Sequence, residues 1–166
     1  MLITLGGLPG VGKTTVAREL ARAIAAVHIR IDSIEQAIVA ANVLAGSIED
    51  AGYRVGYAVA EDNLRLGRTV IADSVNPWPI TREAWRDVAR RAGVRVVEVE
   101  VTCSDAVEHR RRVEERLVAT RAIRPTWQDV LARDYRPWDG DHLVIDTASR
   151  AVDELVATIR ATLTAE

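Results

Sequence analysis

The only lysine in the chain, Lys13, stands in a glycine-rich segment that reads Gly-Leu-Pro-Gly-Val-Gly-Lys-Thr over residues 7–14. All other basic residues among the 22 lysines and arginines are arginine. The segment matches the G-x-x-x-x-G-K-[ST] pattern of phosphate-binding loops. A compact ammonium can reach between the β- and γ-phosphates of a nucleotide as a point charge, whereas the planar fork of arginine fits there less well. The sequence therefore predicts a protein that binds the triphosphate of a nucleotide.

The spacing within this loop has a physical reason at each position. Glycines at positions 7, 10 and 12 permit backbone angles and close approaches that a Cβ atom would block. The backbone N–H groups can then point inward toward phosphate oxygens, and the following helix adds the positive end of its dipole. Thr14 offers a hydroxyl to Mg²⁺, and Thr15 can reach an α-phosphate oxygen. We expect the nucleotide to contact Gly7, Leu8, Pro9, Gly10, Val11, Gly12, Lys13, Thr14 and Thr15.

Strand-like and helix-like segments alternate along the chain and must position these groups. Apolar runs predict strands at residues 2–6, 27–31, 69–72, 94–102 and 142–146. Helical spacing predicts helices at residues 14–25, 34–45, 51–65, 81–92, 105–121, 126–134 and 151–163. This alternation is typical of an α/β domain with a parallel sheet covered on both faces. The strand and helix that flank the loop argue against the alternative of a glycine-rich turn that matches the motif by chance.

The carboxyl ends of the predicted strands indicate where a ligand would bind. In open parallel sheets, ligands lie in the crevice outside these ends. The candidate residues are therefore those that follow each strand: the loop, Asp32, Asp73, residues 103–105, and the pair Asp146 and Thr147.

Length and composition narrow the classes of protein. The 166 residues suit one domain, residues 1–166, and 48% apolar with 28% charged residues is ordinary globular usage. A net charge of −2 gives no overall field that would attract nucleic acid or an anionic membrane. The single Cys103 cannot form an internal disulfide, and the apolar run at residues 2–5 is too short for a signal peptide. We expect a soluble cytoplasmic protein that does not associate with membranes and is a monomer or a homodimer.

Two classes of nucleotide-binding protein fit the chain poorly. A switch GTPase would carry an Asn-Lys-x-Asp motif, which would need a second lysine. An oligomeric remodelling ATPase usually has a longer domain and an arginine finger in trans, whereas we expect this short chain to be complete.

Four segments occur along the chain in an order known from one group of enzymes. They are the loop, Ile-Arg-Ile-Asp at residues 29–32, Val-Ile-Ala-Asp at residues 70–73 and the arginine-rich helix after residue 105. In this they resemble the small P-loop kinases, a group that includes shikimate kinase, gluconate kinase, chloramphenicol phosphotransferase, the zeta-toxin kinases and the kinase half of polynucleotide kinase. Such chains are often labelled AAA family ATPases. The resemblance implies a P-loop NTPase fold: a three-layer α/β sandwich, a five-stranded parallel sheet in the order 2-3-1-4-5 and a helical lid at about residues 104–140.

Asp32 stands at the end of the second predicted strand. In the kinase family an aspartate near this place accepts the hydroxyl proton of the acceptor, so the resemblance implies this role here. A carboxylate near the γ-phosphate can orient an alcohol and take its proton late in a loose phosphoryl transfer. The alternative is that Asp32 caps a helix starting at Ser33 or Ile34, and the two roles can coexist.

Asp73 follows apolar strand residues, as a Walker B acid does. Its expected task is to hold Mg²⁺ through water or to orient Thr14. The alternative is a turn-forming aspartate before the segment Ser-Val-Asn-Pro. Asn76 and Trp78 come next and would wall the acceptor pocket, unless they form a plain turn with one packed tryptophan.

Arg112 and Arg116 lie four residues apart and share one face of a predicted helix. Similar kinases place arginines with this spacing at the start of the lid, where one packs on the adenine and the other meets the phosphates. The resemblance thus assigns both to the nucleotide, and Arg116 to catalysis, with Arg121 and Arg124 as further lid candidates. The alternative is a solvated face whose charges are balanced by neighbouring glutamates.

The region between the second and third predicted strands should supply the acceptor site. Arg54 lies there beside Tyr53 and Tyr57 and would suit an anionic acceptor, although a surface arginine beside two half-buried tyrosines is the alternative. Strand alternation points Arg30 to the same face as Asp32, so Arg30 either partners that acid or contacts the acceptor.

Together these residues predict an ATP- and Mg²⁺-dependent phosphotransferase that moves the γ-phosphate to a hydroxyl of a small-molecule or nucleoside-like acceptor. Lys13, Asp32 and Arg116 would be catalytic, Thr14 and Asp73 would handle Mg²⁺, and Asp32, Arg54 and Asn76 would face the acceptor. One alternative is a polynucleotide 5′-hydroxyl kinase, which the net charge of −2 does not favour. Another is a regulator that binds or slowly hydrolyses ATP without transferring phosphate. The three histidines lack the spacing of zinc ligands.

Overall fold

The structure, a computed structural model, describes residues 1–42, 47–120 and 125–164. Within these residues one parallel sheet has the strand order β2-β3-β1-β4-β5. The strands are β1 (Leu2–Gly6), β2 (Val27–Arg30), β3 (Val70–Asp73), β4 (Val96–Thr102) and β5 (Leu143–Asp146). The predicted fold class and strand order are therefore confirmed.

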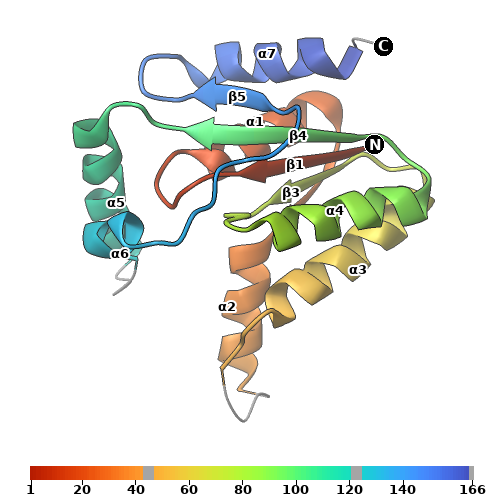
Figure 1. Cartoon of the computed structure of the whole chain (residues 1–166), viewed down its shortest axis with the longest axis horizontal. Coiled ribbons are helices and arrows are strands. Elements are labelled where there is room, and N and C mark those ends of the chain that lie inside the picture. The colour runs from red at the N-terminus through yellow and green to blue at the C-terminus, as the bar shows by residue number, and fades with distance from the viewer. Residues whose placement is uncertain (43–46, 121–124, 165–166) are drawn as a thin grey trace.

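Helices cover both faces of this sheet and the edge where its strands end (Figure 1). On one face lie α1 (Lys13–Ile24) and α7 (Val152–Thr164), and on the other α3 (Ala51–Arg65) and α4 (Pro79–Ala92). Beyond the carboxyl ends of the strands stand α5 (Ala106–Thr120) and α6 (Trp127–Leu131), while α2 (Ile31–Ala41) projects beside α3. Among the residues described, no helix is both long and apolar enough to cross a membrane.

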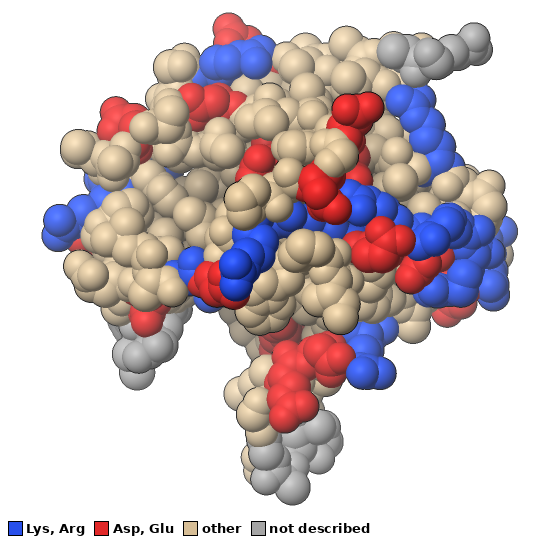
Figure 2. All heavy atoms as spheres, in the orientation of Figure 1, with Lys and Arg blue, Asp and Glu red and all other residues tan. Residues whose placement is uncertain are grey.

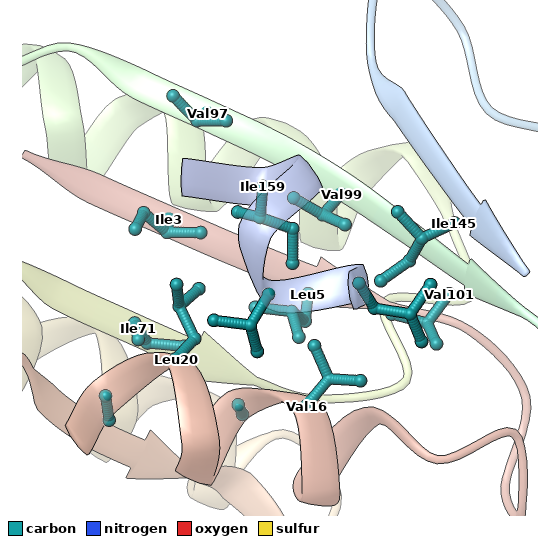
Figure 3. Packing of buried hydrophobic residues seen from close by; sticks show 14 of the residues in the cluster. Ile3, Leu5, Val16, Leu20, Ile71, Val97, Val99, Val101, Ile145 and Ile159 are labelled. Carbon is teal, nitrogen blue, oxygen red and sulfur yellow. The ribbon is translucent and has the colours of Figure 1, made fainter. Parts of the chain in front are cut away.

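Apolar packing on both faces of the sheet fixes its position between the helices. On the α1 and α7 face, Figure 3 shows strand and helix side chains meeting in one cluster that includes Ile3, Leu5, Val16, Leu20, Ile71, Val97, Val99, Val101, Ile145 and Ile159. On the α3 and α4 face, Trp85 is fully buried among other apolar side chains. Every residue of β1 is buried because this central strand is covered from both sides. The phosphate loop therefore leaves the sheet from its central, fully buried strand.

The connection from α6 to β5 is held by a buried arginine. Arg82 of α4 is 1% exposed and donates hydrogen bonds to the carbonyl groups of Asn76, Pro77, Arg136 and Pro137. Its guanidinium also lies 4.5 Å from the ring centroid of Trp138. That ring packs against Gly6, where an added Cβ would lie 2.4 Å from a Trp138 ring carbon. The connection is thereby fixed against the end of β1.

Helix α2 packs closely on α3 through two glycines. Gly52 and Gly56 lie one turn apart in α3 and are both buried. An added Cβ would lie 2.3 Å from Glu35 Cγ at the first and 2.3 Å from Ile31 Cδ1 at the second. This approach sets where the first turn of α2, with Asp32, stands at the carboxyl edge of the sheet.

The boundary between β2 and α2 differs from the sequence prediction. The strand ends at Arg30 and the helix begins at Ile31, whereas the sequence predicted a strand to residue 31 and a helix from residue 34. Asp32 therefore lies inside the first helical turn rather than at a strand end. Helix α6 is also shorter than predicted. The predicted helix ends at residues 45 and 121 lie outside the described residues.

Candidate functional site

The phosphate loop joins β1 to α1 at the carboxyl edge of the sheet. Gly7, Gly10 and Gly12 have positive φ angles of 139°, 86° and 97°. Two of them also have no room for a Cβ, which would lie 2.2 Å from Val101 O at Gly7 and 2.4 Å from Val113 Cγ2 at Gly10. Conformation therefore requires glycine at all three positions, and space requires it at Gly7 and Gly10 as well. The result is a tight loop whose backbone can approach a ligand closely.

Lys13 is buried, with an exposed fraction of 8%. Its Nζ donates hydrogen bonds to Gly7 O at 2.8 Å and to Leu8 O at 2.9 Å. Burial lowers the pKa of Lys13 to about 8, although the nearby charges of Asp73 and Asp32 raise it. The ammonium thus lies inside the curve of the loop, within the field of both acids.

Asp73, the last residue of β3, is 3% exposed and touches the start of α1. Its carboxylate accepts a hydrogen bond from Thr14, and His28 Nε2 lies 3.2 Å from its Oδ2. Burial would raise the pKa of Asp73, but the hydrogen bonds from His28 and Thr14 and the charge of Lys13 lower it below its ordinary value. Asp73 is therefore an ionised acid next to Thr14, as its predicted task requires.

Asp32 in the first turn of α2 is held by arginines from two elements. Arg30 Nη2 lies 2.7 Å and Arg116 Nη2 lies 3.4 Å from Asp32 Oδ2. The residue before the helix, Arg30, makes no side-chain cap, and Asp32 is not the cap residue. The alternative reading of Asp32 as a helix cap is therefore wrong. Arg30 Nε also lies 4.0 Å from Asp73 Oδ2, so one guanidinium spans the two acids.

The two arginines that the sequence assigns to a lid, Arg112 and Arg116, take different positions. Arg116 reaches across to Asp32, while Arg112 donates to Thr147 Oγ1 at 2.8 Å and to Thr147 O at 3.0 Å. The face of α5 that carries Arg112 and Arg116 thus points toward the site, but of these two arginines only Arg116 contacts Asp32, the proposed catalytic acid. The other lid candidates, Arg121 and Arg124, lie outside the described residues.

A family model described as an AAA domain, AAA_33, matches residues 2–137 of the chain. The chain belongs to this AAA domain family. A comparison with the curated proteins finds no match.

Several solved structures share the fold of this AAA domain. The APS kinase of Mycobacterium tuberculosis in complex with AMPPNP and APS is 22% identical, with a TM-score of 0.76, over 99% of this chain and 97% of that one. Kti12 of Chaetomium thermophilum in complex with ADP-AlF3 is 21% identical, with a TM-score of 0.70, over 99% and 100%. A gluconokinase from Sinorhizobium meliloti is 18% identical, with a TM-score of 0.64, over 97% and 94%. The chain therefore has the fold of the small P-loop kinases along nearly its whole length.

Two residues that the sequence predicts to contact the acceptor, Arg54 and Asn76, instead contact neighbouring groups of the chain itself. Arg54 is an exposed side chain of α3 that donates to Asp50 at 2.8 Å, one turn earlier in the chain. Asn76 is 1% exposed, and its Oδ1 accepts a hydrogen bond from Trp85 at 3.1 Å while its Nδ2 donates to Leu5 O. These contacts are those of a surface ion pair and of a core amide. Trp78 is half-exposed and donates to Asp134.

Sequence reasoning missed two charged residues beside the site of the AAA domain. Glu35 lies three positions after Asp32 on α2. Its burial, and to a smaller extent the charge of Asp32, raise the pKa of Glu35, while the charge of Arg133 lowers it. Arg133 also acts on Lys13 and lines a cleft of about 400 Å³ with Pro125, Asp129 and Ala132. Figure 2 shows a notch in the outline between the projecting α2 and the α5 and α6 side. The helical spacing from Asp32 was a signal that could have found Glu35.

Proposed function

We propose that the protein is an ATP- and Mg²⁺-dependent phosphotransferase that moves the γ-phosphate to a hydroxyl of a small-molecule or nucleoside-like acceptor. The observation that carries this proposal is the position of Asp32. Its carboxylate is held by Arg30 and Arg116 and acts on the charge of Lys13 in the phosphate loop. An oriented carboxylate near the phosphate loop suits the transfer of phosphate to an alcohol, whose proton must be taken up.

Lys13 and the loop amides have the stabilising role in this proposal. Phosphoryl transfer passes through a loose transition state with charge on the equatorial oxygens, so fixed donors aimed at these oxygens lower the barrier. The ammonium exchanges its two loop carbonyl partners for phosphate oxygens when a nucleotide is bound. Because Lys13 is 8% exposed, this charge acts in a region from which water is largely excluded.

Thr14 and Asp73 fit a magnesium site of the kind found beside phosphate loops. In proteins Mg²⁺ is usually held by one or two protein groups together with phosphates and waters. An ionised Asp73 hydrogen-bonded to Thr14 matches this need, and in the described part of the chain no cluster of three or more metal-binding side chains offers another site. The bound ion would neutralise charge on the β- and γ-phosphates. Asp73 keeps the Thr14 hydroxyl oriented for it.

Asp32 would orient the acceptor hydroxyl and accept its proton. A general base must lie within hydrogen-bond reach of the proton that it takes. The carboxylate of Asp32 lies on the first turn of α2 and within the field of Lys13. Arg116 would cancel charge on the transferred group, and Arg112 would lie along the nucleotide beside Gly12, where an added Cβ would be 3.8 Å from its Nη1. Glu35 and Arg133, rather than Arg54 and Asn76, are the better candidates for contacts to the acceptor.

A polynucleotide acceptor is less consistent with the surface. On the face shown in Figure 2, basic and acidic side chains are interleaved. On α4, for example, Arg86 pairs with Glu98 and Arg91 pairs with Glu61 of α3. Binding a nucleic acid backbone instead requires many unpaired cations along one groove.

The experiment that tests the proposal is a screen for acceptor-stimulated ADP release. The protein is mixed with ATP and Mg²⁺, and hydroxyl-bearing metabolites, nucleosides and oligonucleotides are added singly, with Lys13→Ala as the blank. We expect at least one small hydroxyl compound to raise ADP release above the blank and to appear as a phosphorylated product. ATP binding with no acceptor response in any class would favour the alternative of an ATP-binding regulator.

A further inference from the structure

The phosphate loop is held from its outer side by side chains of other elements. Four of its carbonyl oxygens accept side-chain hydrogen bonds, those of Gly7, Leu8, Pro9 and Val11. Lys13 supplies the first two. The other two come from outside the loop, because His109 Nε2 lies 2.8 Å from Pro9 O and Thr147 Oγ1 lies 2.7 Å from Val11 O.

These outer contacts determine which way the loop amides point. A trans peptide unit is planar, so its carbonyl and the N–H of the next residue point in opposite directions. A Pro9 carbonyl turned toward His109 directs the N–H of Gly10 to the other side of the loop. A Val11 carbonyl turned toward Thr147 does the same for the N–H of Gly12. Inward N–H groups are what a phosphate loop offers to its ligand.

His109 is itself firmly held within α5. It is 6% exposed, and its ring meets the ring of Trp127 of α6 edge-on, with centroids 5.1 Å apart. One turn further along α5, Val113 lies against Gly10. Because a carbonyl oxygen can only accept, Nε2 of His109 carries the proton of this hydrogen bond.

Thr147 after β5 is connected to the same helix. Arg112 donates to its hydroxyl at 2.8 Å and to its carbonyl at 3.0 Å. The hydroxyl has one proton to donate, and Val11 O at 2.7 Å is its shorter acceptor, while Thr102 O lies at 3.0 Å. Three residues on one side of α5 therefore support the loop. His109 and Val113 contact it directly, and Arg112 acts through Thr147.

We propose that His109 and Thr147 are positioning residues that set the phosphate loop in its nucleotide-binding conformation, and that the first half of α5 is a fixed wall of the site. This inference rests on the proposed function, in which the loop binds ATP. Neither residue touches the nucleotide, and both act through the backbone of the loop.

Substitutions that remove the donor but keep the packing test this proposal. His109→Phe keeps a ring against Trp127, and His109→Gln keeps an N–H donor near the position of Nε2. We expect the Kd for ATP with Mg²⁺ to rise about tenfold in His109→Phe and to stay within about threefold in His109→Gln. Thr147→Val, which removes the hydroxyl, should also raise the Kd about tenfold. Thr147→Ser, which keeps it, should leave the Kd within about threefold.

His142→Phe is the matched control, because His142 contacts Gly140 and Glu100 rather than the loop. Equal ATP affinity in all variants overturns the proposal, and so does an equal loss in His109→Phe and His109→Gln, since the donor would then not be the cause. Amide hydrogen exchange of residues 8–13 without nucleotide gives a second readout, in which only the donor-free variants should exchange faster. If the wild-type protein binds no ATP, the proposed function fails, while this exchange measurement still decides whether the loop is held as proposed.

Discussion

At the scale of single residues, the ammonium of Lys13 is the group whose chemistry responds most directly to a ligand. It is buried, and its partners are two neutral carbonyls of its own loop. Burial lowers the pKa of Lys13 to about 8 in the free protein. Phosphate oxygens in place of the carbonyls would raise this pKa, because they add negative charge at hydrogen-bond distance. Nucleotide binding and protonation of Lys13 are therefore linked.

As far as Lys13 is concerned, the affinity for ATP should consequently be constant well below pH 8 and fall as the pH rises through about 8. As the pH rises through about 8, the free protein loses the proton of Lys13 while the complex keeps it, so binding must take up a proton. The Kd should rise by up to about tenfold per pH unit in this range. Titration calorimetry in buffers of different ionisation enthalpy measures both the Kd and the proton uptake. Lys13→Gln should bind more weakly with no such dependence, and a wild-type Kd that does not change above pH 8 would contradict the linkage.

Replacing Asp32 should separate nucleotide binding from phosphoryl transfer. Asp32→Asn keeps the size of the side chain but removes the base, so acceptor phosphorylation should fall by at least about a hundredfold. ATP binding should change by less than about threefold, since the loop contacts are unaffected. Single-turnover transfer and equilibrium binding measure the two. The control is Asp50→Asn, which alters an exposed acid on α3. Unchanged transfer in Asp32→Asn would remove Asp32 from the mechanism.

The residues that the sequence could predict are those fixed by local spacing. Lys13 and Asp73 follow strands that are recognisable as apolar runs, and the structure puts them within each other's field. Arg133 could not be predicted, because its place beside Lys13 depends on how the chain returns from α6. Asn76 was predicted to face the acceptor, and the structure places its side chain in the core with a hydrogen bond from Trp85.

At the scale of elements, the start of α2 shows why a boundary was missed. The alternation of Ile-Arg-Ile continues the pattern of β2, and the helix begins without a side-chain cap, which is the usual local signal of a helix start. Its position is set instead by packing on Gly52 and Gly56 of α3. This contact joins two segments that are separated in the sequence, so the local alternation of Ile-Arg-Ile could not predict where α2 begins.

A double substitution tests this packing. Gly56→Ala places a methyl group 2.3 Å from Ile31 Cδ1, and Ile31 is 2% exposed with little room to move. We expect Gly56→Ala to lower the free energy of unfolding by about 1–2 kcal/mol despite the better helix propensity of alanine. Ile31→Val deletes the clashing atom and should cost about 1 kcal/mol alone. Urea unfolding should show the double variant to be more stable than the sum of the two losses. Strictly additive losses would mean that the two residues do not contact each other.

At the scale of the whole molecule, the site is assembled from the ends of four strands and from α5. The fold class and sheet order could be predicted because they follow from the alternation of elements and from one loop motif. The proposed acceptor side could not, because its candidate residues lie on α2 and just after α6, far apart in the sequence. No fixed spacing relates residues such as Glu35 and Arg133, which come from different ends of the chain.

The loop follows β1, Asp73 ends β3 and α5 comes after β4, so a nucleotide bound there would contact groups at the ends of three strands and should stabilise the folded chain. A ligand present at 100 times its Kd stabilises the native state by about 2.7 kcal/mol. For a chain of 166 residues this corresponds to a rise in Tm of roughly 5–10 °C. Thermal unfolding with ATP and Mg²⁺ measures this shift. Lys13→Ala should abolish it, Asp73→Asn should reduce it only when Mg²⁺ is present, and Asp32→Asn should leave it intact. A shift that survives in Lys13→Ala would place the nucleotide somewhere other than this loop.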